Sequence, residues 1–488
     1  MAVGFDNSLY VKKQAESILQ RIEKFNNKLY LEFGGKIFDD LHAARVLPGF
    51  DPNVKTKLLL SMKDKVEIIF CISAKAIEQN KRRADFGITY DADLIRLVDN
   101  LRGIGLYVGS VVITQYSGQR AAELFKNKLE RRGERVYMHT LTKGYPNDVD
   151  IIVSDEGYGA QPYIETTRPL VVVTAPGPGS GKLATCLSQL YHEYKRGVKA
   201  GYAKYESFPV WNMPLNHPVN VAYEAATVDL QDFNMIDPHH FAAYGVNTVN
   251  YNRDVAVFPV VKNILHKILG EDIYQSPTDM GVNMIGFAVR DDEVVRAAAK
   301  QEIIRRHYQT LCDYKLGRVS AETLNRSEIL MNNLGLKKED RKVVIPALKK
   351  QEQRGVPACA IELPDGSIVR GRNTPAMKAT AAVVINAMKK YCGIKQDLNL
   401  ISPIVIEPII KMKASLNAKE TSLTLDEALL ALAVSTPMNT TIADLMSKLP
   451  ILKECEAHST VMLEESELQA FRRLGIRITC EPEYAARE

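Results

Sequence analysis

The sequence lacks the cysteine patterns that hold together small secreted domains and zinc sites. Its seven cysteines are widely scattered and odd in number, and no two are spaced as CxxC. A disulfide framework and a cysteine-ligated zinc site both need such spacing. We therefore expect reduced thiols, mostly buried, and no zinc.

Long apolar runs and a strong excess of one charge are also missing. No segment approaches the length of a membrane-spanning helix, and the first residues do not combine a basic end with an apolar stretch, as a secretory signal does. The 63 basic and 58 acidic residues leave a net charge of +5, which is too balanced for the footprint of a nucleic-acid binder. We expect a cytoplasmic protein that binds neither membrane nor nucleic acid.

What remains is an ordinary globular composition in a long chain. With 488 residues, 46% of them hydrophobic, the chain can bury a large core and should form roughly two to four domains. Residues 1–200 alternate strand and helix patterns, starting with a helix at 9–25 and a hairpin made by KLYLEF, Gly34-Gly35 and KIF. The later β-rich runs are VEIIFCIS, LYVGSVVIT, RVYMH, DVDIIVS and PLVVVTA, with helical patterns at 91–101 and 119–132. This alternation predicts an α/β domain with a mostly parallel sheet.

The rest of the chain divides into two further regions. Residues 201–355 carry long amphipathic or basic helical patterns and predict a mainly helical region. Residues 356–488 predict an α+β domain, which begins with the hairpin CAIELPDGSIVRGR around Asp365-Gly366. A helix at 375–391 and a final strand in LGIRITCEP complete this domain.

A glycine-rich loop between a strand and a helix is the clearest functional feature. In PLVVVTAPGPGSGKLATC, Gly177, Gly179 and Gly181 follow a β-branched strand, and Lys182 precedes a helix. Glycines let backbone N–H groups approach phosphate oxygens, a helix N-terminus adds partial positive charge, and a lysine reaches the outer phosphate. We predict a site for ATP or another phosphorylated ligand.

The loop departs from the nucleotide-binding consensus at two positions. Pro176 stands where the leading glycine belongs, and Leu183 stands where a Ser or Thr would bind magnesium. Ser180 and Thr185 are the substitutes that the sequence offers, so magnesium remains an open question. The alternative interpretation is a structural turn that binds no ligand.

Basic and acidic side chains supply further candidates. Lys81, Arg82 and Arg83 are expected to clamp a phosphate or carboxylate of the substrate, unless they form a solvated charge run, and Arg168 is a further substrate-binding candidate. Asp155 and Glu156 follow the predicted strand DVDIIVS and are expected to bind magnesium or act as a general base, or else to form an acidic surface turn.

Two histidine-containing segments are weighed in the same way. Asp237 precedes Pro238 and two histidines, so we expect it to cap a helix, with His239 the candidate that reaches the active cleft. Cys455 and His458 have no partner pair, which favours a buried thiol and a polar contact over a nucleophilic dyad.

Six segments together carry a family resemblance. They are YLEFGGK, NKRRADFGITYD, TAPGPGSGK, MIDPHHFAAYG, SPTDMGVNMIGF and EAHSTVMLEESE. With them the chain resembles, over nearly its whole length, a bacterial family of roughly 500-residue proteins of unknown function. The resemblance implies several domains, with a C-terminal topology similar to the cytidine-deaminase layout. Some members carry an automatic label as ATP-dependent peptidases.

The residues argue against both chemistries that the resemblance suggests. The C-terminal region lacks the His-x-Glu and PCxxC pair of zinc deaminases. Pro178 stands two positions before Ser180, where GxSxG requires glycine, and HExxH is missing. Deaminase and peptidase activities are therefore disfavoured.

Two functions of different classes follow. The first is an enzyme that binds ATP or another phosphorylated small molecule at Gly177–Lys182 and performs phosphoryl transfer or ATP-driven ligation, with Lys182, Asp155, Glu156 and His239 as candidate catalytic residues. The second is a non-catalytic, nucleotide-responsive assembly protein with a degenerate loop. A homo-oligomer is expected in either case, because the long helices offer apolar faces.

Overall fold

The computed structural model describes residues 3–83, 87–230, 232–418 and 420–485. The chain forms two compact units. The N-terminal unit contains the described residues up to Glu224 together with Asp232–Ala299, and the C-terminal unit contains Lys300 onward together with the short segment 225–230. The division into three regions at about residues 200 and 355 stays a prediction.

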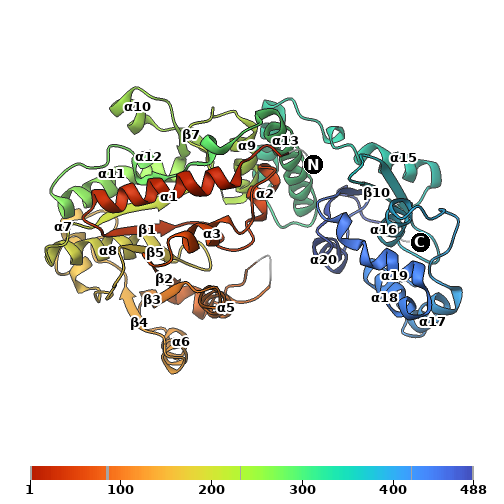
Figure 1. Cartoon of the computed structure of the whole chain (residues 1–488), viewed down its shortest axis with the longest axis horizontal. Coiled ribbons are helices and arrows are strands. Elements are labelled where there is room, and N and C mark those ends of the chain that lie inside the picture. Colours follow the sequence, from red (N-terminus) through yellow and green to blue (C-terminus); the bar gives the residue numbers. More distant parts are fainter. Residues whose placement is uncertain (1–2, 84–86, 231, 419, 486–488) are drawn as a thin grey trace. The chain divides into compact units, whose positions relative to one another are not determined.

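A parallel seven-stranded sheet forms the centre of the N-terminal unit (Figure 1). Its strands, in spatial order, are β4 (Val136–Thr140), β3 (Tyr107–Tyr116), β2 (Val66–Ser73), β5 (Leu170–Thr174), β1 (Leu29–Phe33), β6 (Gly201–Tyr205) and β9 (Gly281–Val282). Every pairing in this sheet is parallel. All residues of β2 and β5 are buried, as expected for central strands covered on both faces.

Helices accompany this sheet in the N-terminal unit, and several of them pack on its strands. They are α1 (Asn7–Lys24), α2 (Leu41–Val46), α3 (Val54–Ser61), α4 (Ala74–Glu78), α5 (Tyr90–Gly103), α6 (Arg120–Arg131), α7 (Val149–Ile152), α8 (Lys182–Lys195), α9 (Pro218–Ala226), α10 (Pro238–Tyr244), α11 (Asn252–Leu269) and α12 (Pro277–Met280). A small antiparallel pair, β7 (Asn234–Ile236) and β8 (Val249–Tyr251), lies beside α10 in the sequence. Helix α8 packs on β1, β5 and β6 and also contacts α11, and Figure 1 shows α8 and α11 side by side.

Two predicted β elements are wrong. The run DVDIIVS forms the short helix α7, because the Asp148 side chain accepts a hydrogen bond from the Ile151 amide and so caps a helical turn. The predicted hairpin at Gly34-Gly35 does not form, because β5 and β6 occupy both edges of β1. Local capping and long-range pairing thus outweigh the β-branched composition of these segments.

A four-stranded mixed sheet forms the C-terminal unit with its own helices. The strands are β11 (Ile368–Arg372), β10 (Ala358–Glu362), β12 (Glu456–Ser459) and β13 (Arg477–Cys480), in that spatial order. The helices are α13 (Asp292–Lys315), which begins in the N-terminal unit, α14 (Ala321–Asn333), α15 (Val344–Arg354), α16 (Ala379–Tyr391), α17 (Pro403–Ser415), α18 (Leu425–Ser435), α19 (Thr440–Ser447) and α20 (Glu465–Arg473). The predicted hairpin around Asp365-Gly366 and the final strand are confirmed.

The predicted fold class is confirmed, with a parallel sheet, a helical middle and a small mixed sheet with helices. The deaminase-like layout of the C-terminal part stays a prediction. All seven cysteines are free and five are buried, which confirms the expectation of reduced, mostly buried thiols. Of the helices in the described ranges, none combines the length and apolar character needed to cross a bilayer.

Candidate functional site

The glycine-rich loop joins the carboxyl end of β5 to the first turn of α8. Gly179 and Gly181 adopt left-handed φ angles of +70° and +77°, which favour glycine. A Cβ atom at Gly181 would lie 2.9 Å from the Thr114 side chain, whereas nothing lies within 4 Å of the corresponding point at Gly179. Gly181 therefore fits the loop against β3, while Gly179 faces open space.

The loop carbonyls are bound by the protein itself. The Thr114 hydroxyl donates to the Ser180 carbonyl at 2.9 Å, the Gln115 amide donates to the Gly179 carbonyl at 3.5 Å, and the Thr185 hydroxyl donates to the Gly181 carbonyl at 3.0 Å. In a trans peptide the N–H of the next residue points away from the preceding carbonyl. The N–H groups of Ser180, Gly181 and Lys182 thus point away from these contacts.

These three amides have no partner in the part of the chain that the structure describes. Among the described residues, no acceptor makes a hydrogen bond with the backbone N–H of Ser180, Gly181 or Lys182. Consecutive free amides at a glycine-rich turn form an anion-binding concavity, and the N-terminus of the 14-residue helix α8 adds partial positive charge. The loop therefore has the geometry of a phosphate cradle.

The Ser180 and Thr185 hydroxyls, the candidate magnesium ligands, make hydrogen bonds within the fold. The Ser180 side chain donates to the Gly177 carbonyl at 2.7 Å, and the Thr185 hydroxyl contacts the Gly181 carbonyl and the Cys71 thiol. Both residues are buried. In this conformation neither hydroxyl extends from the loop toward a ligand.

Lys182 supplies a cation beside the free amides. Across the described ranges no carboxylate lies within ion-pair distance of its ammonium group. Burial raises the pKa of Cys71 to about 12, with the Lys182 charge opposing and the Glu32 charge adding to that rise. The same two charges act on the pKa of Cys186. Glu32 belongs to a different strand, β1. Lys182 and Glu32 thus lie near the same two buried thiols.

A charged cluster that the sequence did not reveal lies at the ends of β1 and β6. The Lys204 ammonium contacts the carboxylates of Asp254 and, at 3.2 Å, Glu206. The Tyr202 hydroxyl donates to the Glu32 carboxylate at 2.8 Å. Lys204 is paired in register with Glu32 of the adjacent strand, so both side chains lie on one face of the sheet.

Glu206 is the titratable member of this cluster. Burial, opposed by Lys204 and supported by the Asp254 charge, raises the pKa of Glu206 to about 7. Its side chain is largely buried, with 10% exposed. Lys204 and Glu206 are two residues apart, a spacing that places side chains on the same face of a strand. The sequence analysis missed this signal because it predicted helices from residue 201 onward.

Of the three adjacent cations, Lys81 is linked to the loop through a shared neighbour, Tyr90. Its ammonium lies 5.6 Å from the centre of the Tyr90 ring, and a Cβ atom at Gly177 would lie 2.5 Å from that same ring. Arg83 instead pairs with the buried Asp93 carboxylate at 2.6 Å, and Arg82 is exposed and donates to the Gly87 carbonyl. Residues 84–86 of this family motif lie outside the described residues.

Arg168 lies at the opposite edge of the sheet. It precedes β5, whereas the loop follows β5, and a strand of five residues spans roughly 16 Å. Its guanidinium donates to the Lys63 and Val66 carbonyls and stacks 4.7 Å from the Tyr107 ring. The structure therefore does not bring Arg168 to the loop.

The predicted acidic pair is also remote from the loop. Asp155 accepts from the Tyr191 hydroxyl at 2.6 Å and pairs with Lys195, both in the last two turns of α8, and Glu156 pairs with Lys143. Helix α8 begins at the loop, so these contacts lie roughly 13 Å further along its axis. The hydrogen bond from Tyr191 lowers the pKa of Asp155, and the one from Lys143 lowers that of Glu156.

His240 rather than His239 reaches a cavity. The His239 ring packs 4.9 Å from the Phe258 ring. His240 contacts the Ser276 hydroxyl at 2.8 Å and lines a cavity of about 370 Å³ with Arg21 and Asp279. The expected cap is confirmed, because Asp237 accepts from the backbone N–H groups of both histidines.

The remaining predicted pair is structural. Cys455 is buried, and the buried His458 ring contacts the Thr479 hydroxyl at 2.9 Å and the Glu481 carboxylate at 3.2 Å. This confirms a buried thiol and a polar contact. Over the described ranges, no group of three His, Cys, Asp or Glu side chains is placed to hold a metal ion.

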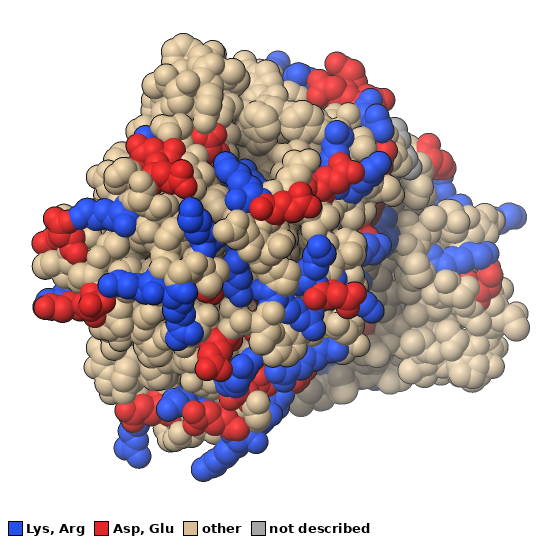
Figure 2. Space-filling view, turned by 60° about the vertical axis from the view of Figure 1, so that its left-hand side comes forward, with Lys and Arg blue, Asp and Glu red and all other residues tan. Residues whose placement is uncertain are grey.

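Basic and acidic side chains alternate over the face of the N-terminal unit that Figure 2 shows, without a continuous region of one sign. Fold and loop together define an open parallel α/β protein with a glycine-rich turn at the carboxyl edge of its sheet. In proteins of this architecture that edge is where ligands bind.

Comparisons with known proteins place the chain in a family. Residues 3–335 match the family model described as "Domain of unknown function DUF1846, N-terminal", and residues 339–488 match its C-terminal counterpart. The chain is 59% identical to a UPF0371 protein of Clostridium botulinum (strain Langeland) and 58% identical to one of Clostridium tetani (strain Massachusetts), in each case over 99% of this chain and 98% of the relative. The chain belongs to this conserved bacterial family of unknown function.

Proposed function

We propose that the N-terminal unit binds a phosphorylated small molecule at the Gly177–Lys182 loop. The amides of Ser180, Gly181 and Lys182 contact the phosphate oxygens, the Lys182 ammonium neutralises their charge, and Lys81 is a second cation near the loop. ATP is one such ligand. The observation that carries the proposal is the run of three amides without partners, beside carbonyls that side chains already bind.

The same edge of the sheet offers an acid–base group. A pKa of about 7 lets Glu206 accept or donate a proton near neutral pH. The Lys204 ammonium, which also contacts Asp254, pairs with the Glu206 carboxylate. We therefore favour an enzyme that transfers a phosphoryl group or ligates a small molecule, with Glu206 as the proton-transfer group in place of Asp155, Glu156 or His239.

A separate observation favours the second function. Because the Ser180 and Thr185 hydroxyls contact loop carbonyls, the loop itself presents no side-chain oxygen to magnesium. A non-catalytic protein that senses a nucleotide and assembles as a homo-oligomer needs no such oxygen. Light scattering with and without ATP separates the two functions, because assembly that follows ATP without turnover supports the second.

The binding proposal is tested on the full chain by calorimetry with ATP, AMP, pyrophosphate and glucose 6-phosphate. Gly179→Val should weaken binding because its side chain fills the open side of the loop. Gly197→Val is the matched control, since Gly197 also has a left-handed φ and open space around it but lies beyond the other end of α8. The proposal fails if no probe binds at millimolar concentration, or if Gly179→Val binds as tightly as the parent and the control.

A further inference from the structure

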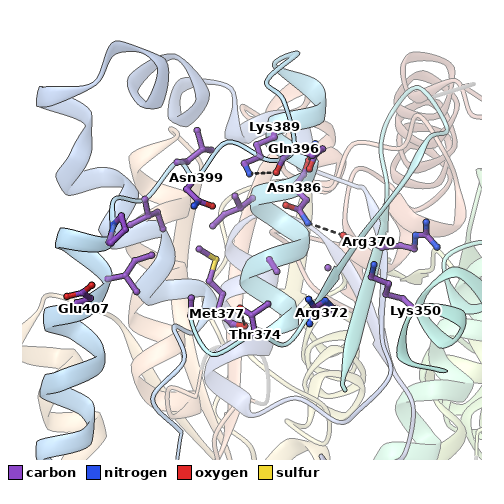
Figure 3. Close-up of a pocket in the computed structure, with 18 residues that line it drawn as sticks. Lys350, Arg370, Arg372, Thr374, Met377, Asn386, Lys389, Gln396, Asn399 and Glu407 are labelled. Carbon is purple, nitrogen blue, oxygen red and sulfur yellow. Dashed lines mark hydrogen bonds between the residues drawn. The ribbon is translucent and has the colours of Figure 1, made fainter. Parts of the chain in front are cut away.

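A second cavity lies entirely within the C-terminal unit, against β11, α16 and α17 (Figure 3). Its volume of about 490 Å³ lies within the range of roughly 300 to 1,000 Å³ that small-molecule sites occupy. Its polar lining residues include Lys350, Arg370, Arg372, Asn386, Lys389 and Asn399. The sequence analysis singled out none of them.

Three cations line one end of this cavity. Lys350 comes from α15, and Arg370 and Arg372 come from β11. Gly371 lies between the two arginines, and a Cβ atom there would lie 2.3 Å from the Val383 amide of α16. Because side chains alternate along a strand, the arginines extend from the face of β11 opposite to α16. Helix α15 packs on β10 and β11, which brings Lys350 to the same place.

The positive charge of these cations is not compensated. Burial lowers the pKa of Lys350, and the charges of Arg370, Arg354 and Arg372 lower it further. Among the described residues, no carboxylate pairs with Lys350, Arg370 or Arg372. The acidic residue on the cavity lining is Glu407, and Figure 3 shows it at the far side from the cations.

Several other cations of the same unit are paired. Lys342 contacts Glu362 at 3.1 Å, Lys413 contacts Glu427 at 2.8 Å, and the buried Arg341 contacts Glu456 at 2.6 Å. Like charges that converge without a partner destabilise the folded state, and a multiply charged anion removes that cost. The cavity therefore combines a hollow with three cations for which the described residues supply no paired carboxylate.

The rest of the cavity suits the body of a small molecule. The Asn386 amide donates to the Arg370 carbonyl at 3.0 Å and keeps its oxygen as an acceptor. The Lys389 ammonium donates to the Gln396 carbonyl at 3.0 Å, which holds the segment that contains Asn399 over α16. Ile385 and Leu400 add apolar surface.

We propose that this cavity, here called the C-terminal anion pocket, binds a phosphorylated small molecule. The phosphate lies beside Lys350, Arg370 and Arg372 at the edge strand β11, and the body of the ligand extends past that edge along α16. The C-terminal anion pocket is independent of the Gly177–Lys182 loop, because all of its lining residues belong to the C-terminal unit.

The test uses the full chain and calorimetry with pyrophosphate, AMP and glucose 6-phosphate. The double variant Lys350→Gln/Arg372→Gln should bind at least one probe tenfold or more weakly than the parent protein. The control Lys349→Gln/Lys390→Gln removes the same charge from exposed positions of α15 and α16 outside the pocket, and should bind as the parent does. Lys182→Ala should also leave this binding unchanged, which separates the pocket from the loop.

A second measurement distinguishes binding from a structural role. At low salt and without ligand, the Tm of Lys350→Gln/Arg372→Gln should equal or exceed that of the control, because a repulsion is removed. Pyrophosphate should raise the Tm of the control but not of the pocket variant. A pocket variant with a lower Tm than the control assigns these cations to the fold and overturns the proposal. Absence of binding by every probe, or equal weakening in the control, also overturns it.

Discussion

The two units assemble charged groups in different ways. In the N-terminal unit, parallel strands end at one edge of the sheet, so residues as distant as Glu32, Lys182 and Glu206 meet there. In the C-terminal unit, the C-terminal anion pocket is built from one stretch, residues 350–407. The N-terminal cluster pairs its lysine with carboxylates, whereas the cations of the C-terminal anion pocket have no paired carboxylate among the described residues. Topology thus decides whether a site is assembled from distant or neighbouring segments.

The largest expected effect is a loss of stability from a substitution that disrupts the packing beneath the C-terminal anion pocket. Gly371→Ala places a Cβ atom 2.3 Å from a backbone nitrogen of α16, so β11 and α16 must separate. We expect the free energy of unfolding to fall by about 3 kcal/mol or more, measured by urea denaturation. Gly366→Ala is the control, because its φ of +80° strains the turn but nothing lies within 4 Å, and its cost should be about 1 kcal/mol. Equal costs would refute this account of the packing.

The next effect concerns the loop of the N-terminal unit. Lys182→Ala should weaken the binding of a phosphate ligand by roughly 1.5 to 3 kcal/mol, the scale of a charge-assisted contact. The free energy of unfolding should change little, because Lys182 has no ion-pair partner in the described part of the chain. Calorimetry and urea denaturation measure the two quantities. Unchanged affinity for every ligand that binds would remove Lys182 from the site.

A smaller effect, on the pH dependence of stability, tests the charged cluster of Lys204, Glu206 and Asp254. The pKa of Glu206 is raised to about 7 in the folded protein from an ordinary value of 4.5. Between these values the unfolded chain releases the proton and the folded protein retains it, so this contribution to stability is full below pH 4.5 and is lost as pH rises through 7. In the parent protein the free energy of unfolding should therefore fall by an amount on the order of 1 to 3 kcal/mol as pH rises. Glu206→Gln should remove this fall.

The measurement compares urea midpoints at pH 5 and pH 8. Glu156→Gln serves as the control, because Glu156 is 69% exposed and the Lys143 contact lowers rather than raises its pKa. If Glu206→Gln retains the full loss of stability seen in the parent protein, then Glu206 does not titrate as the geometry requires.

The smallest expected effect is that of metal removal. We predict a zinc-independent fold, since the cysteines and histidines lack ligand spacing. Dialysis against EDTA should leave the Tm of the full chain unchanged, and elemental analysis should find no stoichiometric zinc. Zinc at one equivalent per chain would contradict this prediction.

The sequence by itself determined the elements whose signals are local. The hairpin around Asp365-Gly366 formed because its turn residues and alternating flanks agree. The loop from β5 to α8 was readable because its glycines stand between a β-branched strand and an amphipathic helix. The role of Asp237 as a helix cap could be predicted because an Asp side chain directly before a proline is typical of a helix N-terminus.

Only the tertiary structure decided which of the candidate residues meet. Arg168 and the loop flank the same strand but lie at opposite edges, because a strand carries its two ends apart. Asp155 lies beside the far end of α8 because the segment before it caps a helix instead of extending a strand. Glu206 and Lys350 acquire shifted pKa values from burial and from charges contributed by other segments. Such proximity arises from long-range packing, which residue spacing along a single chain does not encode.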